Sequence, residues 1–262
     1  MSVRVAAPDL QAFAEGIFRS AGVGAEHASA WAATLVWANL RGVDSHGVLR
    51  IPRYLEWLGS GVINPAPAMV MRVAAGAVGL LDADRAPGPV AMMRAMEEAV
   101  AIARRLSLGW VVARDITHAG AVGHFALHAA QAGLIGMVMT ASGPLMAWPG
   151  SRGAVVSTNP IAIAVPAGSR PPLLLDMSTA SVALGKVMGA KDAGTPIPEG
   201  WGVDAAGHPT TDPARVATLL PMAGAKGAGL SLMIECLARA WRRAIRSSPR
   251  RFGAAGQRTG RG

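Results

Sequence analysis

Apolar side chains recur at helical spacing in the first sixty residues of the chain, and this pattern predicts three helices. A second helix is predicted from about residue 25 to residue 40, and a third from Pro52 to about residue 60. Proline is favoured in a first turn because its missing N–H has no partner there. The apolar face of the first helix is formed by Leu10, Phe13, Ala14, Ile17, Phe18 and Ala21. The chain is therefore expected to begin with a small helical unit.

After residue 65 the pattern changes to short apolar runs between turn residues, with further helices among them. Helices are predicted from Pro87 to Gly109, after the glycine-bearing turn at 119–123, and from Leu230 to Leu237. Strands are predicted near 70–73, 78–81, 110–113, 135–141, 161–165 and 173–176. The chain contains no G-x-G-x-x-G pattern and no P-loop pattern. A Rossmann dinucleotide site is therefore not expected.

Composition indicates an ordered globular protein, with 51% hydrophobic residues among 262. Cys236 is the single cysteine, which excludes a disulfide framework and a cysteine-based zinc site and suits a reducing cytoplasm. The N-terminus lacks the apolar run of a signal peptide. The uncharged stretch 117–151 contains histidines and prolines, so it reads as buried core and not as a membrane span.

The net charge of +9 belongs mainly to the end of the chain. Residues 239–262 contain eight arginines and no acidic residue, so the rest of the chain carries only +1. A basic segment of this kind could bind nucleic acid or an acidic surface. No nucleic-acid-binding motif or aromatic interleaving accompanies it, and we do not expect a nucleic-acid partner.

The stretch from Arg41 to Tyr54 is the first candidate site, because it sets polar groups on a tight connection between two predicted helices. His46 could exchange a proton near neutral pH, and Arg50 could hold a planar carboxylate through two parallel hydrogen bonds. The alternative is that Asp44 or Ser45 only caps a helix and the arginines are solvated. A serine-protease triad is excluded, because its members converge from separate positions in the chain.

A second candidate follows the strand predicted at 110–113, where His118 stands by a glycine-bearing turn. His124 and His128 are four residues apart on the next helix and share one face. We favour packing or hydrogen bonding for this pair, since two histidines without nearby carboxylates make a poor metal site. A metal-dependent enzyme using His118, His124 and His128 is the corresponding alternative. Lys226 lies among small residues before an apolar helix, a setting that suits a phosphate or a carboxylate.

Taken together, these motifs resemble the malate/L-lactate dehydrogenase family of the non-Rossmann type, which includes ureidoglycolate dehydrogenase, sulfolactate dehydrogenase, 2,3-diketogulonate reductase and a cyclic-imine reductase. They occur in family order from residue 9 to about residue 237. The matching stretches are Asp44–Val48 with Arg50 and Tyr54, Thr117–Gly123, Thr158–Ala162, Asp176–Ser178 with Gly185–Lys186, Ile197–Trp201 with Pro209–Pro213, and Lys226–Gly227 with Gly229–Leu230.

The resemblance implies an α+β fold in three parts. Residues 1–65 would form the helical unit, and residues 66–237 a mostly antiparallel or mixed sheet domain that binds a nicotinamide cofactor. Residues 238–262 would form a basic, disordered tail. It also implies a homodimer and hydride transfer between NAD or NADP and a malate- or lactate-like 2-oxo or 2-hydroxy acid.

The resemblance also assigns roles to individual residues. His118 is expected to be the proton donor, His46 to polarise the substrate or share the proton, and Arg50 to hold the substrate carboxylate. Cofactor contacts are expected from Ser142, Asn159, Asp176, Met177, Ser178 and Lys226. No metal ligand is expected.

The likeness fades after Cys236, where family members usually continue. This leads to the expectation that a C-terminal segment is missing and that activity is compromised. The alternative function is then an inactive remnant that retains only dimerisation or interaction.

Overall fold

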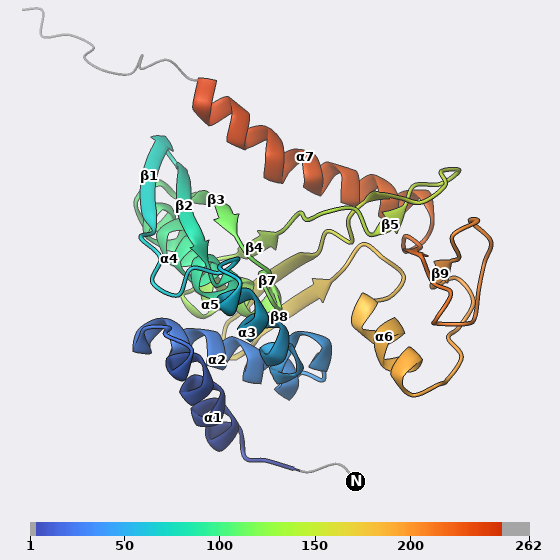
Figure 1. Cartoon of the computed structure of the whole chain (residues 1–262). Helices are drawn as coiled ribbons and strands as arrows, with labels where there is room; N and C mark the ends of the chain where they lie inside the picture. Colours follow the sequence, from blue (N-terminus) through green and yellow to red (C-terminus); the bar gives the residue numbers. More distant parts are fainter. Residues whose placement is uncertain (1–3, 248–262) are drawn as a thin grey trace, which may run out of the picture.

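The computed structural model describes the fold of residues 4–247 and the side chains of residues 4–238 (Figure 1). Three helices form the helical unit, at α1 (Ala7–Ser20), α2 (Ala25–Leu40) and α3 (Ile51–Gly59). The sequence pattern predicted all three, with Pro52 in the first turn of α3. Two short 3₁₀ turns, η1 (Asp44–His46) and η2 (Val48–Arg50), connect α2 to α3.

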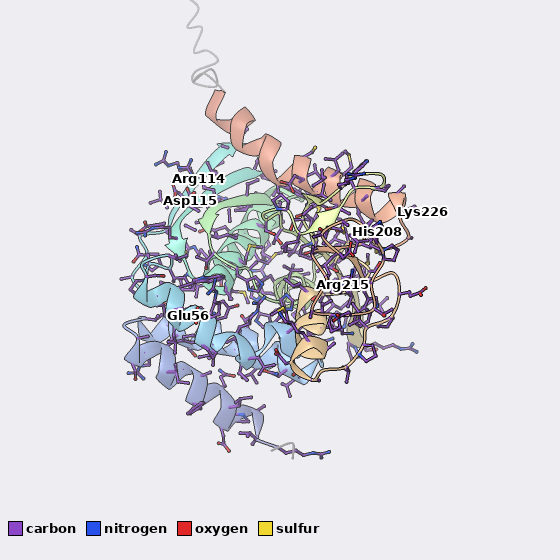
Figure 2. All side chains as sticks on the ribbon, turned by 45° about the vertical axis from the view of Figure 1, so that its right-hand side comes forward. Glu56, Arg114, Asp115, His208, Arg215 and Lys226 are labelled. Atoms are coloured by element: carbon purple, nitrogen blue, oxygen red, sulfur yellow. The ribbon has the colours of Figure 1, made fainter. Side chains whose placement is uncertain are left out.

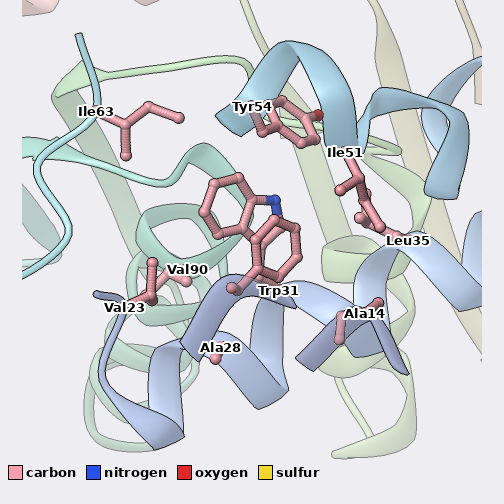
Figure 3. Packing of buried hydrophobic residues seen from close by; sticks show 11 residues of the cluster. Ala14, Val23, Ala28, Trp31, Leu35, Ile51, Tyr54, Ile63 and Val90 are labelled. Carbon is pink, nitrogen blue, oxygen red and sulfur yellow. The ribbon is translucent and has the colours of Figure 1, made fainter. Parts of the chain in front are cut away.

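The core of the helical unit is built on aromatic rings (Figure 3). Phe18 stacks on Trp31 with ring centroids 4.0 Å apart, and Trp31 meets Tyr54 at 5.0 Å. All three rings are buried, which adds ring–ring attraction to a large apolar area removed from water. Val90 of α4 (Gly88–Leu106) joins this cluster, so the helical unit packs directly on the next part of the chain.

The first sheet positions the second candidate histidine. It has the order β1-β2-β3, formed by β1 (Val70–Ala75), β2 (Val78–Ala86) and β3 (Trp110–Ile116). β1 and β2 are antiparallel, whereas β2 and β3 are parallel and joined through α4. A β-strand, crossover helix and parallel strand in this order place the end of β3, and therefore His118, beside the start of α4.

The second sheet is antiparallel and has the order β4-β7-β8, formed by β4 (Gly136–Met139), β7 (Ile161–Ala167) and β8 (Arg170–Met177). One face packs on α5 (Gly123–Gln131), where Phe125 and Ala126 meet Val138, Ala162 and Ala164. Alternate side chains along a strand point to opposite faces, so Leu173 and Leu175 lie on the other face, and both are exposed.

The remaining elements are short or lie late in the chain. A third sheet with the order β6-β5-β10-β9 combines β5 (Met146–Ala147), β6 (Ala154–Val156), β9 (Gly202–Val203) and β10 (Thr218–Leu219). These strands and α6 (Leu184–Asp192) were not predicted. Strands of two or three residues show no alternation to recognise, and α6 carries two glycines, which weaken a helical signal.

The last helix, α7 (Ala225–Ser247), is longer than the sequence pattern predicted. It begins among the small residues before Leu230 and continues past Leu237 to Ser247, so it includes the first residues of the predicted tail. Figure 1 shows α7 on the side of the molecule opposite α1. The rest of the tail, residues 248–262, lies outside the described residues.

The predicted α+β class is confirmed, with small mixed sheets, helices packed against them and no barrel. The division at residues 65 and 237 stays a prediction. Among the residues that the structure describes, no helix is both long and apolar enough to cross a membrane.

Candidate active site

Asn39 on α2 holds the connection that carries the first candidate residues. Its Nδ2 donates to Asp44 Oδ1 at 2.5 Å, and its Oδ1 accepts the Val48 N–H at 3.0 Å. Gly47 lies so close that an added Cβ would fall 2.3 Å from Asn39 Oδ1. The two consecutive 3₁₀ turns therefore depend on a glycine at this position, because any side chain would displace Asn39.

Ser45 then links the two functional side chains of the connection. Its Oγ lies 3.0 Å from His46 Nδ1, and its carbonyl oxygen accepts a hydrogen bond from Arg50 Nε at 3.0 Å. The Nε contact leaves the outer nitrogens of the guanidinium to face other groups. Arg50 is thus held by its inner nitrogen while keeping donors for a carboxylate.

His118 reaches the same place from the end of β3. The neighbouring Thr117 Oγ1 accepts the Gly88 N–H at 3.0 Å and donates to the Ala86 carbonyl at 3.2 Å. Gly88 at the start of α4 approaches so closely that an added Cβ would lie 2.1 Å from the His118 carbonyl oxygen. The backbone at His118 is therefore held between the end of β2 and the start of α4. This restricts where the His118 ring can lie.

The rings of His46 and His118 stack, with centroids 5.3 Å apart and planes 26° from parallel. The Tyr54 hydroxyl lies 2.8 Å from His118 Nδ1. His46, Arg50 and His118, which are far apart in the chain, are thus gathered at one place together with Tyr54. A functional role for Tyr54 was not predicted. The available signal was its position as the chain's single tyrosine, four residues after Arg50.

Burial dominates the electrostatics of this group. Together with the nearby Arg50 charge, which contributes less, it lowers the pKa of His46 to about 4. It also lowers the pKa of His118 to about 3, with Arg50 and His46 acting in the same direction. Burial raises the pKa of Tyr54 above its ordinary range, and Arg50 only partly opposes this. At neutral pH both imidazoles are uncharged and Tyr54 keeps its proton, and the Tyr54 hydroxyl and His118 Nδ1 share one hydrogen bond whose direction depends on the tautomer of the ring.

A cavity of about 580 Å³ opens beside His118, which is large enough for a small organic acid. Trp57 of α3 and Asp84 and Arg85 near the end of β2 line it, whereas His46 and Arg50 are not among its lining residues. The loop at Asp115–Thr117 completes the lining near His118. The cavity therefore gives a small molecule a route to the turn that carries the histidine.

Asp176 connects the predicted cofactor residues to the His118 loop. Its Oδ2 accepts the Gly123 N–H at 2.9 Å, and an added Cβ on Gly123 would lie 2.5 Å from that oxygen. Burial raises the pKa of Asp176, although the Gly123 hydrogen bond and the Arg41 charge act in the opposite direction. Met177 ends β8 opposite Ile161, and the Ser178 hydroxyl donates to the Ala180 carbonyl at 3.4 Å.

Asn159 lies against α7, and Ser142 is linked to that helix through Ser157. The Ser142 and Ser157 hydroxyls are 2.5 Å apart, and Ser231 Oγ donates to the Ser157 carbonyl at 2.7 Å. Asn159 is fully buried, and its Nδ2 donates to the Ser231 carbonyl at 3.0 Å and to Glu235 Oε2 at 2.9 Å. Asn159 therefore ties the start of β7 to α7. A cofactor contact by this residue stays a prediction, and its geometry favours a structural role.

Lys226 is exposed near the N-terminal end of α7 (Figure 2), on the side of the molecule that also carries His208 and Arg215. The next residue, Gly227, packs so closely that an added Cβ would lie 2.8 Å from the Thr179 carbonyl. That carbonyl also accepts the Met222 N–H at 3.0 Å. The start of α7 is therefore pressed against the segment that follows Ser178, which brings Lys226 near the end of β8.

His124 and His128 do not form a metal site with His118. Within residues 4–247, no three histidine, cysteine, aspartate or glutamate side chains gather as a metal would need. His124 instead packs against the Trp37 ring at 5.2 Å and the Phe125 ring at 5.6 Å. Burial, followed by the His128 charge, lowers the pKa of His124 to about 4. This is the packing role that the sequence favoured.

The fold and the cluster of imidazoles define the class of this protein. The model of the malate/L-lactate dehydrogenase family matches residues 5–252. The chain therefore belongs to this family.

Particular relatives sharpen this assignment. The chain is 37% identical over 235 residues to ureidoglycolate dehydrogenase (NAD(+)) of Escherichia coli, covering 90% of this chain and 67% of that protein. It is 39% identical over 245 residues to malate dehydrogenase of Pyrococcus horikoshii, covering 90% of this chain and 68% of that protein. It is 38% identical over 240 residues to (2R)-3-sulfolactate dehydrogenase (NADP(+)) of Chromohalobacter salexigens, covering 90% and 72%.

Solved structures agree with the sequence comparison. A dehydrogenase from Sinorhizobium meliloti matches with a TM-score of 0.87 and 36% identity, covering 91% of this chain and 70% of that one. The sulfolactate dehydrogenase of Methanocaldococcus jannaschii matches with a TM-score of 0.81 and 37% identity, covering 88% and 67%. The relatives named for their cofactor use NAD(+) or NADP(+). The resemblance suggested by the sequence motifs is thereby confirmed.

Proposed function

We propose that the chain is an oxidoreductase that moves a hydride between NAD(P)H and a 2-oxo or 2-hydroxy acid. The observation that carries this proposal is the buried group of His46, His118, Tyr54 and Arg50, which combines neutral proton carriers with one guanidinium. The names of the relatives support it, since they act on malate, sulfolactate or ureidoglycolate. All three substrates carry a hydroxyl next to a carboxylate.

The nicotinamide ring supplies or accepts the hydride at its C4 carbon. When a carbonyl is reduced, its oxygen gains negative charge and needs a proton. His118 is proposed to give that proton from Nε2 as an imidazolium, after which the neutral ring keeps its other proton on Nδ1, hydrogen-bonded to the Tyr54 oxygen. His46, stacked on His118 and steadied by the Ser45 hydroxyl, is proposed to polarise the carbonyl oxygen.

Arg50 is proposed to hold the substrate carboxylate. Its Nε already donates to the Ser45 carbonyl, so the remaining N–H groups are available for an anion. Because the Arg50 charge lowers the pKa of His46 and of His118, a bound carboxylate that neutralises it raises both values. Substrate binding therefore brings the histidines closer to the pKa range in which they exchange protons.

The residues around β8 and α7 provide groups that suit a dinucleotide. Asp176 offers a carboxylate to hydroxyl groups, Ser142 and Ser178 offer hydroxyls, and Lys226 offers a cation near the first turn of α7 for phosphate. Met177 completes the predicted set with an apolar contact. This donor set fits the family's nicotinamide cofactor without a Rossmann glycine fingerprint.

A homodimer is part of the proposal. The face of the β4-β7-β8 sheet that points away from α5 exposes Met137, Leu173 and Leu175, with fractional exposures of 46%, 70% and 48%. Apolar sheet faces of this kind are typical of subunit interfaces. Sedimentation at several concentrations would show a dimer, and a strictly monomeric chain would contradict this part.

The test of the proposed activity has two stages. Titration with NADH and with NADPH, followed by fluorescence, should show saturable binding of at least one cofactor. A panel of 2-oxo acids, with and without a second acidic group, should then give cofactor oxidation with at least one member. Binding without turnover on any panel member would restrict the function to cofactor binding. Absence of binding would favour a protein that only dimerises or interacts.

A further inference from the structure

Ser45 is the point where three parts of the candidate site meet. Its hydroxyl lies 3.0 Å from His46 Nδ1, and its carbonyl oxygen accepts the Arg50 Nε–H at 3.0 Å. Any displacement of the Ser45 backbone therefore moves the support of the His46 ring and of the Arg50 guanidinium together. The two groups proposed to contact the substrate thus share one anchor.

The third partner of Ser45 comes from a distant part of the chain. Gly185, the second residue of α6, lies so close that an added Cβ would be 2.5 Å from Ser45 Cβ. The Ser45 Cα and Oγ would both lie 3.5 Å from the same added atom. A separation of 2.5 Å between two carbons is far below van der Waals contact, which begins near about 3.5 Å. One of the two segments would have to move.

α6 stands directly downstream of the predicted cofactor residues. β8 ends at Met177, and the short connection through Ser178 leads into α6 at Leu184. This connection is fixed in place, since the Thr179 N–H donates to the Thr158 carbonyl at 3.1 Å and the Ser181 N–H to the Leu220 carbonyl at 2.9 Å. The first turn of α6 is therefore a rigid surface against which Ser45 rests.

We propose that Gly185 is a positioning residue, which by lacking a side chain seats Ser45 against α6 and so orients His46 and Arg50 relative to the proposed cofactor residues that precede α6. The proposal rests on the proposed function of the site, because it concerns where the substrate-contacting groups stand relative to the cofactor. Gly185 itself is proposed to touch neither substrate nor cofactor. It acts only through Ser45.

Gly185→Ala tests the proposal, and Gly189→Ala is the matched control. Both glycines lie in α6, four residues apart, but an added Cβ at Gly189 meets nothing within 4 Å. Both variants replace a glycine of the same helix by alanine, and the gain in helix propensity in the interior control is at least as large as that in the first turn. Small displacements of reacting groups reduce rates steeply, so we expect kcat/KM to fall at least about tenfold in Gly185→Ala. Gly189→Ala should stay within about twofold of the parent chain.

A spectroscopic measurement on the chain without cofactor separates positioning from general damage. The ring nitrogen and carbon-bound proton signals of His46 should shift in Gly185→Ala and stay in place in Gly189→Ala, because only the first displaces the Ser45 hydroxyl from Nδ1. NADH affinity should be the same in both variants. Unchanged His46 signals in Gly185→Ala, or equal changes in both variants, would overturn the proposal.

A double-mutant cycle keeps the proposal testable even if Gly185→Ala folds poorly. Ser45→Gly removes the Cβ that the new methyl group would strike. In this background the added alanine should have no further effect on the His46 signals or on kcat/KM, because residues in contact give non-additive effects. An undiminished effect of Gly185→Ala in the Ser45→Gly chain would contradict a contact through Ser45.

The outcome can be read separately from the proposed activity. If the parent chain binds no cofactor and turns over no 2-oxo acid, the proposed function fails, while the His46 signals still report on the Gly185 contact. If the parent chain is active and the signals or rates do not distinguish Gly185→Ala from Gly189→Ala, only the positioning role fails.

Discussion

The two halves of the candidate site are built in different ways. In the imidazole half, the His118 ring beyond the end of β3 contacts both the His46 ring of η1 and the Tyr54 hydroxyl of α3. In the half proposed to bind the cofactor, which we call the cofactor half, Asp176 and Asn159 are hydrogen-bonded to the backbone of neighbouring elements, and Lys226 is exposed on α7. The first half holds reactive groups close together, whereas the hydrogen bonds of the second half mainly hold neighbouring elements against one another.

Residues that occupy similar positions in the sequence motifs can therefore have different roles in the structure. Asn159 and His118 both lie in family motifs at the ends of strands. His118 presents its ring to other titratable groups beside a cavity, while Asn159 is fully buried and joins β7 to α7. A substitution in the imidazole half should therefore act on rate, and one at Asn159 on stability.

The largest expected effect is that of His118→Asn. Loss of a positioned proton donor should lower kcat by about 10² to 10⁴. NADH affinity should change little, because His118 belongs to the imidazole half. Steady-state kinetics and fluorescence titration measure the two quantities separately. A variant that turns over at the parent rate would remove His118 from the chemistry.

Arg50→Ala should act mainly on substrate binding. Loss of a charge-assisted carboxylate contact is expected to raise KM by about 10 to 100-fold with a smaller change in kcat. Arg53→Ala is the control, since Arg53 is exposed in the first turn of α3, three residues further along the chain, and pairs with Glu56. An equal loss of kcat and kcat/KM in Arg50→Ala would contradict the carboxylate role.

Asn159→Ala and Asp176→Asn should separate structure from binding within the cofactor half. Removing the Asn159 amide leaves the Ser231 carbonyl without that donor, which should lower the free energy of unfolding by about 1–3 kcal/mol. Asp176→Asn keeps an oxygen for the Gly123 N–H but removes the charge, so it should weaken NADH binding more than it lowers stability. Denaturant unfolding and NADH titration of both variants test this, and the reverse pattern would contradict it.

The smallest expected effect per residue is the change in unfolding free energy that each buried histidine causes when the pH is lowered. Burial lowers the pKa values of His46 and His124 to about 4 and of His118 to about 3, whereas in the unfolded chain they return to about 6.5. The unfolded state therefore binds more protons as the pH falls below 6.5, and each histidine removes about 1.4 kcal/mol of stability per pH unit. This contribution is complete above pH 6.5 and falls progressively toward pH 4.

Comparison of His124→Asn with the parent chain between pH 7 and pH 5 isolates this effect from that of Asp176, whose raised pKa acts in the opposite direction. The lowered pKa values of Asp82 and Asp204 act only at lower pH, below the ordinary range of a carboxyl group. His124→Asn should reduce the slope of unfolding free energy against pH by the share of one histidine. An unchanged slope would mean that His124 is not buried as described.

Sequence periodicity was sufficient for the long elements. It predicted α1 to α5 and the strands of the first two sheets, because each of these shows several turns of helical spacing or several alternations. It could not predict α6 or the two-residue strands β5, β9 and β10, whose order depends on contacts with distant segments. It also ended α7 too early, since apolar spacing fades where arginines become frequent.

The candidate site was predictable as a list of residues but not as an arrangement. The motifs pointed to His46, Arg50 and His118, and the structure brings them together. The Tyr54 hydrogen bond and the Gly185 contact were not predictable, because they join segments 64 and 140 residues apart through single atoms. Such contacts leave no periodic pattern in a sequence.

We propose above all that this chain transfers a hydride to a 2-oxo acid held between His118 and Arg50. It is tested most directly by incubating the chain with NADH or NADPH deuterated at C4 and a 2-oxo acid, then analysing the product by mass spectrometry. We expect a 2-hydroxy acid with one deuterium on the carbon that bore the oxo group, and loss of this product in His118→Asn. A 2-hydroxy acid formed without deuterium from either face of the labelled ring would contradict it.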